Sequence, residues 1–187
     1  MNNALSVDQF LVSPGRGEAS NTHLQVKVRS AQLGGDFSIM QGVMEPGELL
    51  CPHTHEREDQ CIFIIDGELE FELGGKDGLR FKAGTGSYII KPRGISHAFW
   101  NATETPVKYI ELSGQDGFER WVASHDEGNL KAAMNSKRDF AMHLHVERVP
   151  SLLKEHGLKK LAGMDEPPAA VRGALRTFIT AFGSSLS

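Results

Sequence analysis

The feature that most constrains this 187-residue sequence is a series of short apolar or alternating segments separated by glycine-containing turns. Alternation with a period of two places every second side chain on one face, as in a β-strand half buried against a core. Eight such segments occur, at residues 22–30, 36–44, 61–66, 68–73, 79–83, 87–91, 97–101 and 107–112. They predict an all-β fold, an antiparallel jelly-roll barrel over residues 22–113.

The residues on either side of this region follow other patterns. Helical spacing of apolar residues occurs at 117–124, 126–136, 149–163 and 167–182, and the last segment begins with two prolines. We therefore expect residues 114–187 to form a helical tail packed on the barrel, and residues 1–21 to form an N-terminal extension. Residues 139–149 fit either a helix of this tail or an additional strand.

Composition and charge exclude several kinds of partner. The net charge is −4 and the lysines and arginines are scattered, which argues against a nucleic-acid surface. No apolar run approaches the roughly 20 residues that a membrane-spanning helix needs. Residues 1–17 lack the basic start and apolar stretch of a secretory signal, and two cysteines are too few for a disulfide framework. We expect a cytoplasmic protein with a small-molecule substrate.

Three histidines and a glutamine are the candidate metal ligands. His53 and His55 are separated by one residue, so in a strand both imidazoles point to the same face. Gln60 on a neighbouring strand and His97 on a more distant one would complete three or four ligands around a point inside the barrel. Neutral imidazoles suit one divalent ion of Fe, Ni, Mn, Co, Cu or Zn. By itself, an HxH pair is more often two surface or core side chains.

The surroundings of these residues resemble the two sequence motifs of the cupin superfamily. In the first motif, five residues separate Gly47 from His53, the position that is usually acidic holds Gln60, and Gly67 closes the motif. The second motif is matched at Gly86, Pro92, Gly94, His97 and Asn101, so nine of ten fixed positions agree across the two motifs. The resemblance implies a cupin barrel that holds one metal ion on His53, His55, His97 and the residue at position 60.

Gln60 departs from the usual glutamate of the family. An amide cannot act as a base, but its carbonyl oxygen can bind a metal ion, as a glutamine does in the phosphomannose isomerase branch. The alternative is that Gln60 only hydrogen-bonds a water molecule. Glu58 and Asp59 lie beside it, and alternation predicts that Gln60 is the inward residue. Without the carboxylate, the charge of the ion is less neutralised, which favours anionic ligands such as an enolate.

An apolar pocket is expected next to the ion. Phe99 follows His97 by two residues, and Ile62 and Ile64 alternate with Gln60, so all three point into the barrel. They could form the wall that holds a flat organic substrate, or they could simply be core residues.

The length and the helix directly after the barrel, GFERWVAS, resemble those of the bacterial quercetin 2,3-dioxygenase group. This resemblance implies a metal-dependent dioxygenase that acts on an aromatic or enolisable small molecule. Two alternatives remain open: a non-redox metal-dependent isomerase or polyketide cyclase, and a ligand-binding cupin without turnover. We also expect a homodimer, because the N-terminal extension is long enough to add a strand to a neighbouring sheet.

Overall fold

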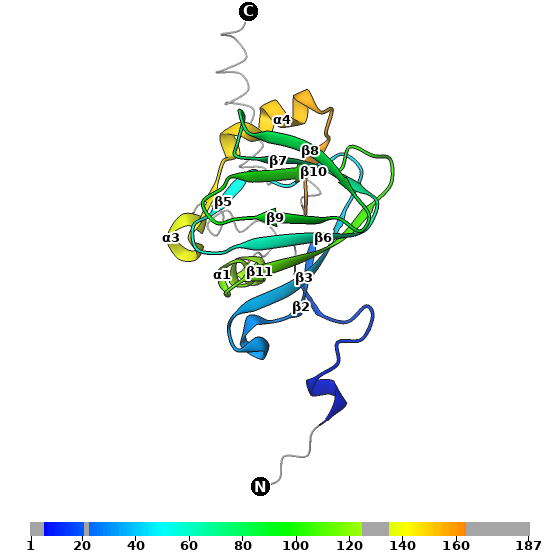
Figure 1. The fold of residues 1–187 in the computed structure, drawn as a ribbon, viewed down its shortest axis with the longest axis vertical. Helices are drawn as coiled ribbons and strands as arrows, with labels where there is room; N and C mark the ends of the chain where they lie inside the picture. The colour runs from blue at the N-terminus through cyan, green and yellow to red at the C-terminus, as the bar shows by residue number, and fades with distance from the viewer. Residues whose placement is uncertain (1–5, 21–22, 125–134, 164–187) are drawn as a thin grey trace, which may run out of the picture.

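Two β-sheets face each other in the computed structural model, which describes residues 6–20, 23–124 and 135–163 (Figure 1). The first sheet contains, in spatial order, β1 (Glu18–Ala19), β2 (Leu24–Val28), β3 (Phe37–Met44), β11 (Val107–Gly114), β6 (Gln60–Asp66) and β9 (Tyr88–Lys91). The second sheet contains β12 (Met142–Leu144), β5 (His53–His55), β10 (His97–Trp100), β4 (Glu48–Leu49) and β13 (Lys160–Leu161), with β7 (Glu68–Leu73) paired to β10 and β8 (Leu79–Gly84) paired to β7. The predicted all-β fold is confirmed.

All eight predicted segments contain a strand, because alternation of side chains is a local property that the sheets preserve. The two-residue strands β1, β4 and β13 were not predicted, since two residues are too few to show a period. The remaining described elements are three 3-10 helices, η1 (Val7–Gln9), η2 (Ser30–Leu33) and η3 (Val146–Arg148), and the helices α1 (Gly117–Ser124), α3 (Ser136–Phe140) and α4 (Val149–Glu155).

The core lies between the two sheets and is formed by the inward side chains of their strands. Met40, Ile62 and Ile64 of the first sheet are fully buried, as are Phe71 and Phe99 of the second. Burial of a side chain of this size stabilises the fold by about 1.5–3 kcal/mol. The core therefore fixes how the two sheets face each other.

One close approach within the first sheet requires a glycine. Gly42 of β3 lies opposite Tyr109 of β11, and a Cβ atom at Gly42 would be 2.4 Å from Cζ of the tyrosine. The Tyr109 ring thus lies over the neighbouring strand, and its edge meets the Phe99 ring at a centroid distance of 5.5 Å. This contact links the two sheets.

The residues after the barrel are less helical than predicted. Helix α1 forms at 117–124 as expected, and residues 139–149 contain β12, which is the strand alternative. The helix expected over 149–163 ends at Glu155, because Gly157 adopts a φ of +63°, and Lys160–Leu161 then pair with β4 as a parallel strand. The helices predicted at 126–136 and 167–182 fall largely or wholly outside the described residues. The division into extension, barrel and tail stays a prediction.

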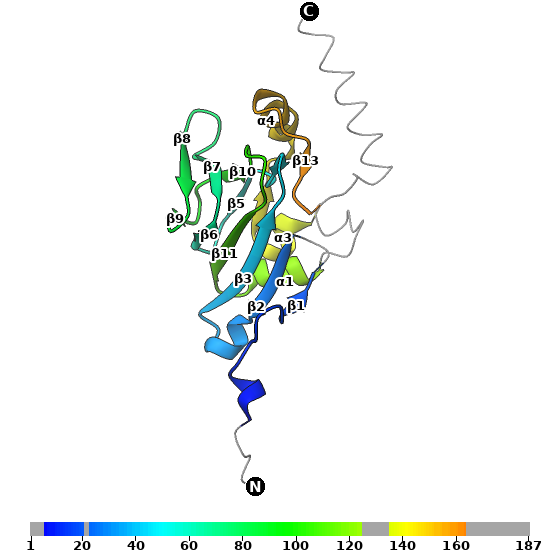
Figure 2. The same cartoon turned by 90° about the vertical axis from the view of Figure 1, so that its right-hand side faces the viewer.

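The segment after β12 is attached to the second sheet by apolar and charged contacts. Val149 and Leu152 of α4 form a second apolar cluster with Leu49, Ala98 and Trp100 on the outer face of the sheet. Figure 2 shows α4 and β13 beside this sheet.

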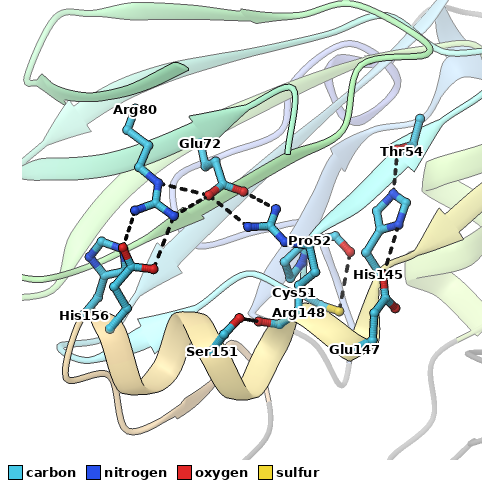
Figure 3. A network of polar contacts seen from close by, with 11 residues as sticks. Cys51, Pro52, Thr54, Glu72, Arg80, His145, Glu147, Arg148, Ser151 and His156 are labelled. Atoms are coloured by element: carbon cyan, nitrogen blue, oxygen red, sulfur yellow. Dashed lines mark hydrogen bonds and ion pairs between the residues drawn. The ribbon is translucent and has the colours of Figure 1, made fainter. Parts of the chain in front are cut away.

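A buried carboxylate strengthens this attachment (Figure 3). Glu72 of β7 accepts hydrogen bonds from Arg148, which precedes α4, and from Arg80 of β8, which also pairs with Glu155. Burial by itself would raise the pKa of Glu72, but the hydrogen bonds from Arg148 and Arg80 outweigh burial and lower that pKa. The Glu72 network, defined as Glu72, Arg80, Arg148 and Glu155, therefore contains an ionised carboxylate.

Within the described residues, no helix combines the length and the apolar character needed to cross a membrane.

Candidate metal centre

The three predicted histidines meet inside the barrel. His53 and His55 point inward from β5, and His97 of β10 lies directly opposite His53 in antiparallel register. Their side chains are almost fully buried, and one nitrogen of each lies within 4.8 Å of the other two. In the part of the chain that the structure describes, this is the one group of three or more potential metal-binding side chains. The register of β5 and β10 thus brings together two motifs that are far apart in the sequence.

The hydrogen bonds of the three rings fit a metal ion. Nδ1 of His53 lies 2.8 Å from the carbonyl oxygen of Cys51, and Nδ1 of His97 lies 3.1 Å from that of Ile95. A carbonyl oxygen only accepts, so both Nδ1 atoms donate and both Nε2 atoms carry a lone pair. These two Nε2 atoms are 3.0 Å apart, so their lone pairs repel each other. A cation bound by both nitrogens would remove this repulsion.

His55 completes the arrangement. Its Nδ1 lies 3.1 Å from Oε2 of Glu58, which leaves Nε2 as the free ring nitrogen. That Nε2 atom is buried and has no hydrogen-bond partner among the described residues. Burial, followed by the nearby charge of Lys91, lowers the pKa of His55 to about 3, and burial also lowers the pKa of His53 and His97. Neutral imidazole is the form that binds metal ions, so all three residues are suited to hold one.

Gln60 lies where alternation predicts. It is the first residue of β6, its side chain is buried, and its Nε2 donates to Oγ of Ser113 at 3.2 Å. Its Oε1 is buried without a partner among the described residues, which fits a ligand oxygen or an acceptor for water. The neighbouring Asp59 points to solvent and pairs with Arg93. Direct binding of the ion by Gln60 stays a prediction.

Glu58 also belongs to the candidate site, although the sequence pattern does not single it out. Its carboxylate is buried, accepts a hydrogen bond from Nδ1 of His55, and accepts another from the backbone N–H of Phe118 in α1 at 2.9 Å. A Cβ atom at residue 117 would be 2.9 Å from Oε1, so Gly117 makes room for this contact. Burial raises the pKa of Glu58 to about 7. The three-residue spacing from His55 was visible in the sequence, but the position of α1 was not.

Two further charged residues inside the barrel were also missed. Lys91 and Glu111 are buried, and Nζ of Lys91 lies 2.8 and 3.0 Å from the two carboxylate oxygens of Glu111. Alternation along β9 and β11 does place both residues on the inner face. They were overlooked because lysine and glutamate in a strand are usually exposed.

The predicted pocket residues are all in the core. Ile62, Ile64 and Phe99 are fully buried and belong to the main apolar cluster. Their position agrees with core packing, and a role in binding a substrate stays a prediction.

The chain is similar to one family model and to several solved structures. Residues 40–113 match the family model described as the cupin domain, and none of the curated proteins matches the chain. An uncharacterised Klebsiella pneumoniae protein with a double-stranded β-helix domain is 18% identical, over 62% of this chain and 91% of that protein, with a TM-score of 0.44.

Two other solved structures show a similar degree of likeness. KdgF from Halomonas sp. is 22% identical over 50% of this chain and 79% of its own, with a TM-score of 0.43. A cupin family protein with a double-stranded β-helix fold from Methanocaldococcus jannaschii is 16% identical over 56% of this chain and 90% of its own, with a TM-score of 0.45. At these identities the likeness concerns the fold alone. The match over residues 40–113, together with the two facing sheets, supports placing this barrel in the cupin superfamily.

Proposed function

We propose that this protein is a metal-dependent dioxygenase that acts on an aromatic or enolisable small molecule, of the kind that bacterial quercetin 2,3-dioxygenases cleave. The observation that supports it is the convergence of three neutral imidazoles whose Nδ1 atoms are all engaged and whose Nε2 atoms face one another. His53, His55 and His97 would hold a divalent ion. Such an ion supplies Lewis acidity and, for Fe, Ni or Mn, a route to oxygen chemistry.

The chain's own residues favour an anionic substrate. The three histidines are neutral, and Gln60 brings no charge to the position where the family usually has a glutamate. Both carboxylate oxygens of Glu58 are engaged, one by Nδ1 of His55 and one by the N–H of Phe118, so this residue would act through His55. A flavonol or a 1,3-diketone bound as its enolate would supply the missing negative charge.

Oxygen uptake tests this proposal. The protein is loaded separately with Fe²⁺, Ni²⁺, Mn²⁺ and Zn²⁺ and mixed with a panel of flavonols and 1,3-diketones. Uptake is expected with a redox-capable ion, and it should be lost in His97→Ala and kept in His143→Ala, which alters an exposed histidine. Absence of uptake with every ion and every substrate of the panel would contradict the dioxygenase.

A second candidate is a non-redox isomerase or cyclase. The buried Lys91–Glu111 pair favours it, because an ammonium and a carboxylate inside the barrel are groups that can transfer protons. For this candidate, Zn²⁺-loaded protein would catalyse proton exchange at the carbon next to a carbonyl, measured by deuterium incorporation, without oxygen uptake. A ligand-binding protein without turnover would show neither signal.

Two expectations from the sequence stay predictions. Cys51 and Cys61 are free thiols, in keeping with the cytoplasmic location that we propose. We also propose a homodimer, because Val7, Phe10 and Leu11 of the N-terminal segment, which extends away from the barrel (Figure 1), expose more than half of their surface. Sedimentation that shows a monomer at micromolar concentration would contradict the dimer.

A further inference from the structure

Lys91 and Glu111 form an ion pair inside the barrel. Neither residue is one of the proposed metal ligands, so the metal centre does not explain the pair. Lys91 is 1% exposed and Glu111 is 2% exposed, and both carboxylate oxygens lie within 3.0 Å of the ammonium. Burying two charges costs several kcal/mol for each ion, and their attraction does little more than offset this cost. Apolar side chains of similar size would fill the same space, so stability alone does not account for the pair.

The ammonium lies between the two sheets, on the side of the strand that carries His97. Lys91 is opposite Gln60 in the pairing of β9 with β6, and its Nζ is 5.6 Å from the centre of the Phe99 ring on the other sheet. Phe99 follows His97 by two residues, which is about 6.6 Å along a strand.

The sheet that carries Lys91 has a row of buried polar side chains. Ser38, Ser113, Gln60 and Lys91 occupy one row across β3, β11, β6 and β9. Within the described residues, Oγ of Ser38 and Oε1 of Gln60 are buried and have no hydrogen-bond partner. Buried polar atoms of this kind are normally satisfied by water or a ligand, so this row indicates a place for polar atoms that the protein does not supply.

The charges show which kind of ligand fits. Lys91 and Glu111 cancel each other, a metal-binding imidazole is neutral and Gln60 carries no charge, so the buried Glu58 beside His55 is the one side chain named here that offsets part of the two positive charges of a divalent ion. An ammonium has three donors, and Glu111 does not occupy all of them. One donor can therefore point toward the histidines while Glu111 fixes the position of the lysine.

We propose that Lys91 binds one oxygen of a small organic anion, such as the enolate of a 1,3-diketone, whose other oxygen lies toward the three histidines. Glu111 acts as the positioning residue that holds Lys91 in place. This inference deepens the proposed function and rests on the metal centre, but it concerns ligand binding and holds for an oxygenase and an isomerase alike.

The test measures anion binding to protein loaded with Co²⁺. Lys91→Met alone leaves a buried carboxylate unpaired and endangers the fold, so the main variant is the double change Lys91→Met with Glu111→Gln, which replaces the pair by neutral groups of similar size. Lys108→Met is the matched control, because Lys108 is an exposed lysine on β11. Visible absorption reports bound Co²⁺, and calorimetry gives the dissociation constant of acetylacetone at a pH where it forms its enolate.

The expected result is one Co²⁺ per chain in all three proteins, with acetylacetone bound at least tenfold more weakly by the double variant than by wild type and Lys108→Met. Equal affinity in wild type and double variant would overturn the role of Lys91 and leave the metal centre standing. An equal loss in Lys108→Met would overturn it too, since the effect would then be one of net charge. Failure of the wild type to bind Co²⁺ would remove the metal centre and this inference together.

Discussion

The chain contains two HxH pairs on neighbouring strands, and they have opposite surroundings. His53 and His55 on β5 are buried and face His97. His143 on β12 is exposed, and His145 just after it is partly exposed and hydrogen-bonds Oγ1 of Thr54 at 2.9 Å. The ring centroids are similarly spaced within each pair, 4.9 Å in the first and 4.6 Å in the second.

The register between the two strands explains the difference. Met142 pairs with His55 and Leu144 with His53, so these apolar residues of β12 share the inner face with the ligands, whereas His143 lies opposite Thr54 on the other face. An HxH spacing therefore shows that two imidazoles lie on the same face of a strand. Whether that face is the inner one depends on how the strand pairs with its neighbour.

The largest expected difference between the two pairs concerns metal content. His55→Ala removes a nitrogen ligand from the inner face and should lower the metal content from close to one ion per chain to nearly none, as should His53→Ala and His97→Ala. His143→Ala should leave it unchanged. Elemental analysis of protein purified without a histidine tag measures this, and unchanged content in His53→Ala and His97→Ala would show that the assigned centre is wrong.

The next largest difference is expected between the carboxylates beside the two histidine pairs, in their effect on metal binding. Glu58 lies 3.1 Å from Nδ1 of His55, and Glu147 lies 3.7 Å from Nδ1 of His145. Glu58→Gln removes the anion that orients a ligand and should weaken metal binding about 10- to 100-fold. Glu147→Gln should have no effect. Competition with a chromogenic chelator gives both affinities, and equal affinities in the two variants would contradict the role of Glu58.

A smaller effect is expected at Gln60, which belongs to the buried site by its position but adds no charge to it. Gln60→Glu restores the carboxylate with little change in length and should tighten metal binding on the order of tenfold, since an anionic oxygen is the stronger ligand. Gln41→Glu, on the outer face of β3, is the control. Metal and a flavonol are titrated into wild type and the two variants to measure both affinities. Identical behaviour of Gln60→Glu and wild type would show that residue 60 does not face the ion.

The flavonol titration also distinguishes two roles for the native glutamine. If the uncompensated charge binds an anionic substrate, Gln60→Glu should keep its metal and lose substrate affinity. If Gln60 stands in place of a catalytic base, the variant should instead gain flavonol-cleaving activity.

The smallest effect concerns the segment that carries His143 and His145. It tests whether the contacts that hold this segment on the barrel are independent of the metal centre. Glu72→Gln breaks the Glu72 network and should lower the free energy of unfolding by about 1–2 kcal/mol near neutral pH, without loss of metal. The folded-state pKa of Glu72 is below its ordinary 4.5, so its contribution is present above that pH and is lost as the pH falls through the lowered value. Urea unfolding at several pH values should show wild type and variant converging in acid.

The matched variant for this comparison is Glu155→Gln. Its side chain is 49% exposed, so it should change stability much less than Glu72→Gln. A pH-independent difference between wild type and Glu72→Gln would contradict an ionised Glu72.

The sequence was sufficient for the parts of the structure that depend on short-range pattern. The resemblance to two family motifs singled out His53, His55 and His97 as candidate ligands, and alternation located eight of the strands, because a strand fixes the direction of its side chains. It also distinguished Gln60 from Asp59, which differ by one position and therefore by one face.

The rest depends on contacts between distant segments. The role of Glu58 is visible only once Phe118 is placed beside it, and the pairing of Lys91 with Glu111 depends on the order of β9, β6 and β11. The early end of α4 had a local signal in Gly157, but the pairing of Lys160–Leu161 with β4 had none. Elements of two residues have too little pattern to be predicted.

The contact between Glu58 and the N-terminus of α1 has a consequence for the order of events during synthesis. A nascent chain that has emerged as far as residue 113 already carries every proposed metal ligand, but the N–H of Phe118 that holds Glu58 is still missing, as are the residues of β12 that pair with β5. The ligand set, together with the carbonyls of Cys51 and Ile95, is thus complete before Glu58 is fixed beside His55, so a chain at this stage would hold metal less tightly. Tight capture would begin only when the segment after the barrel has docked.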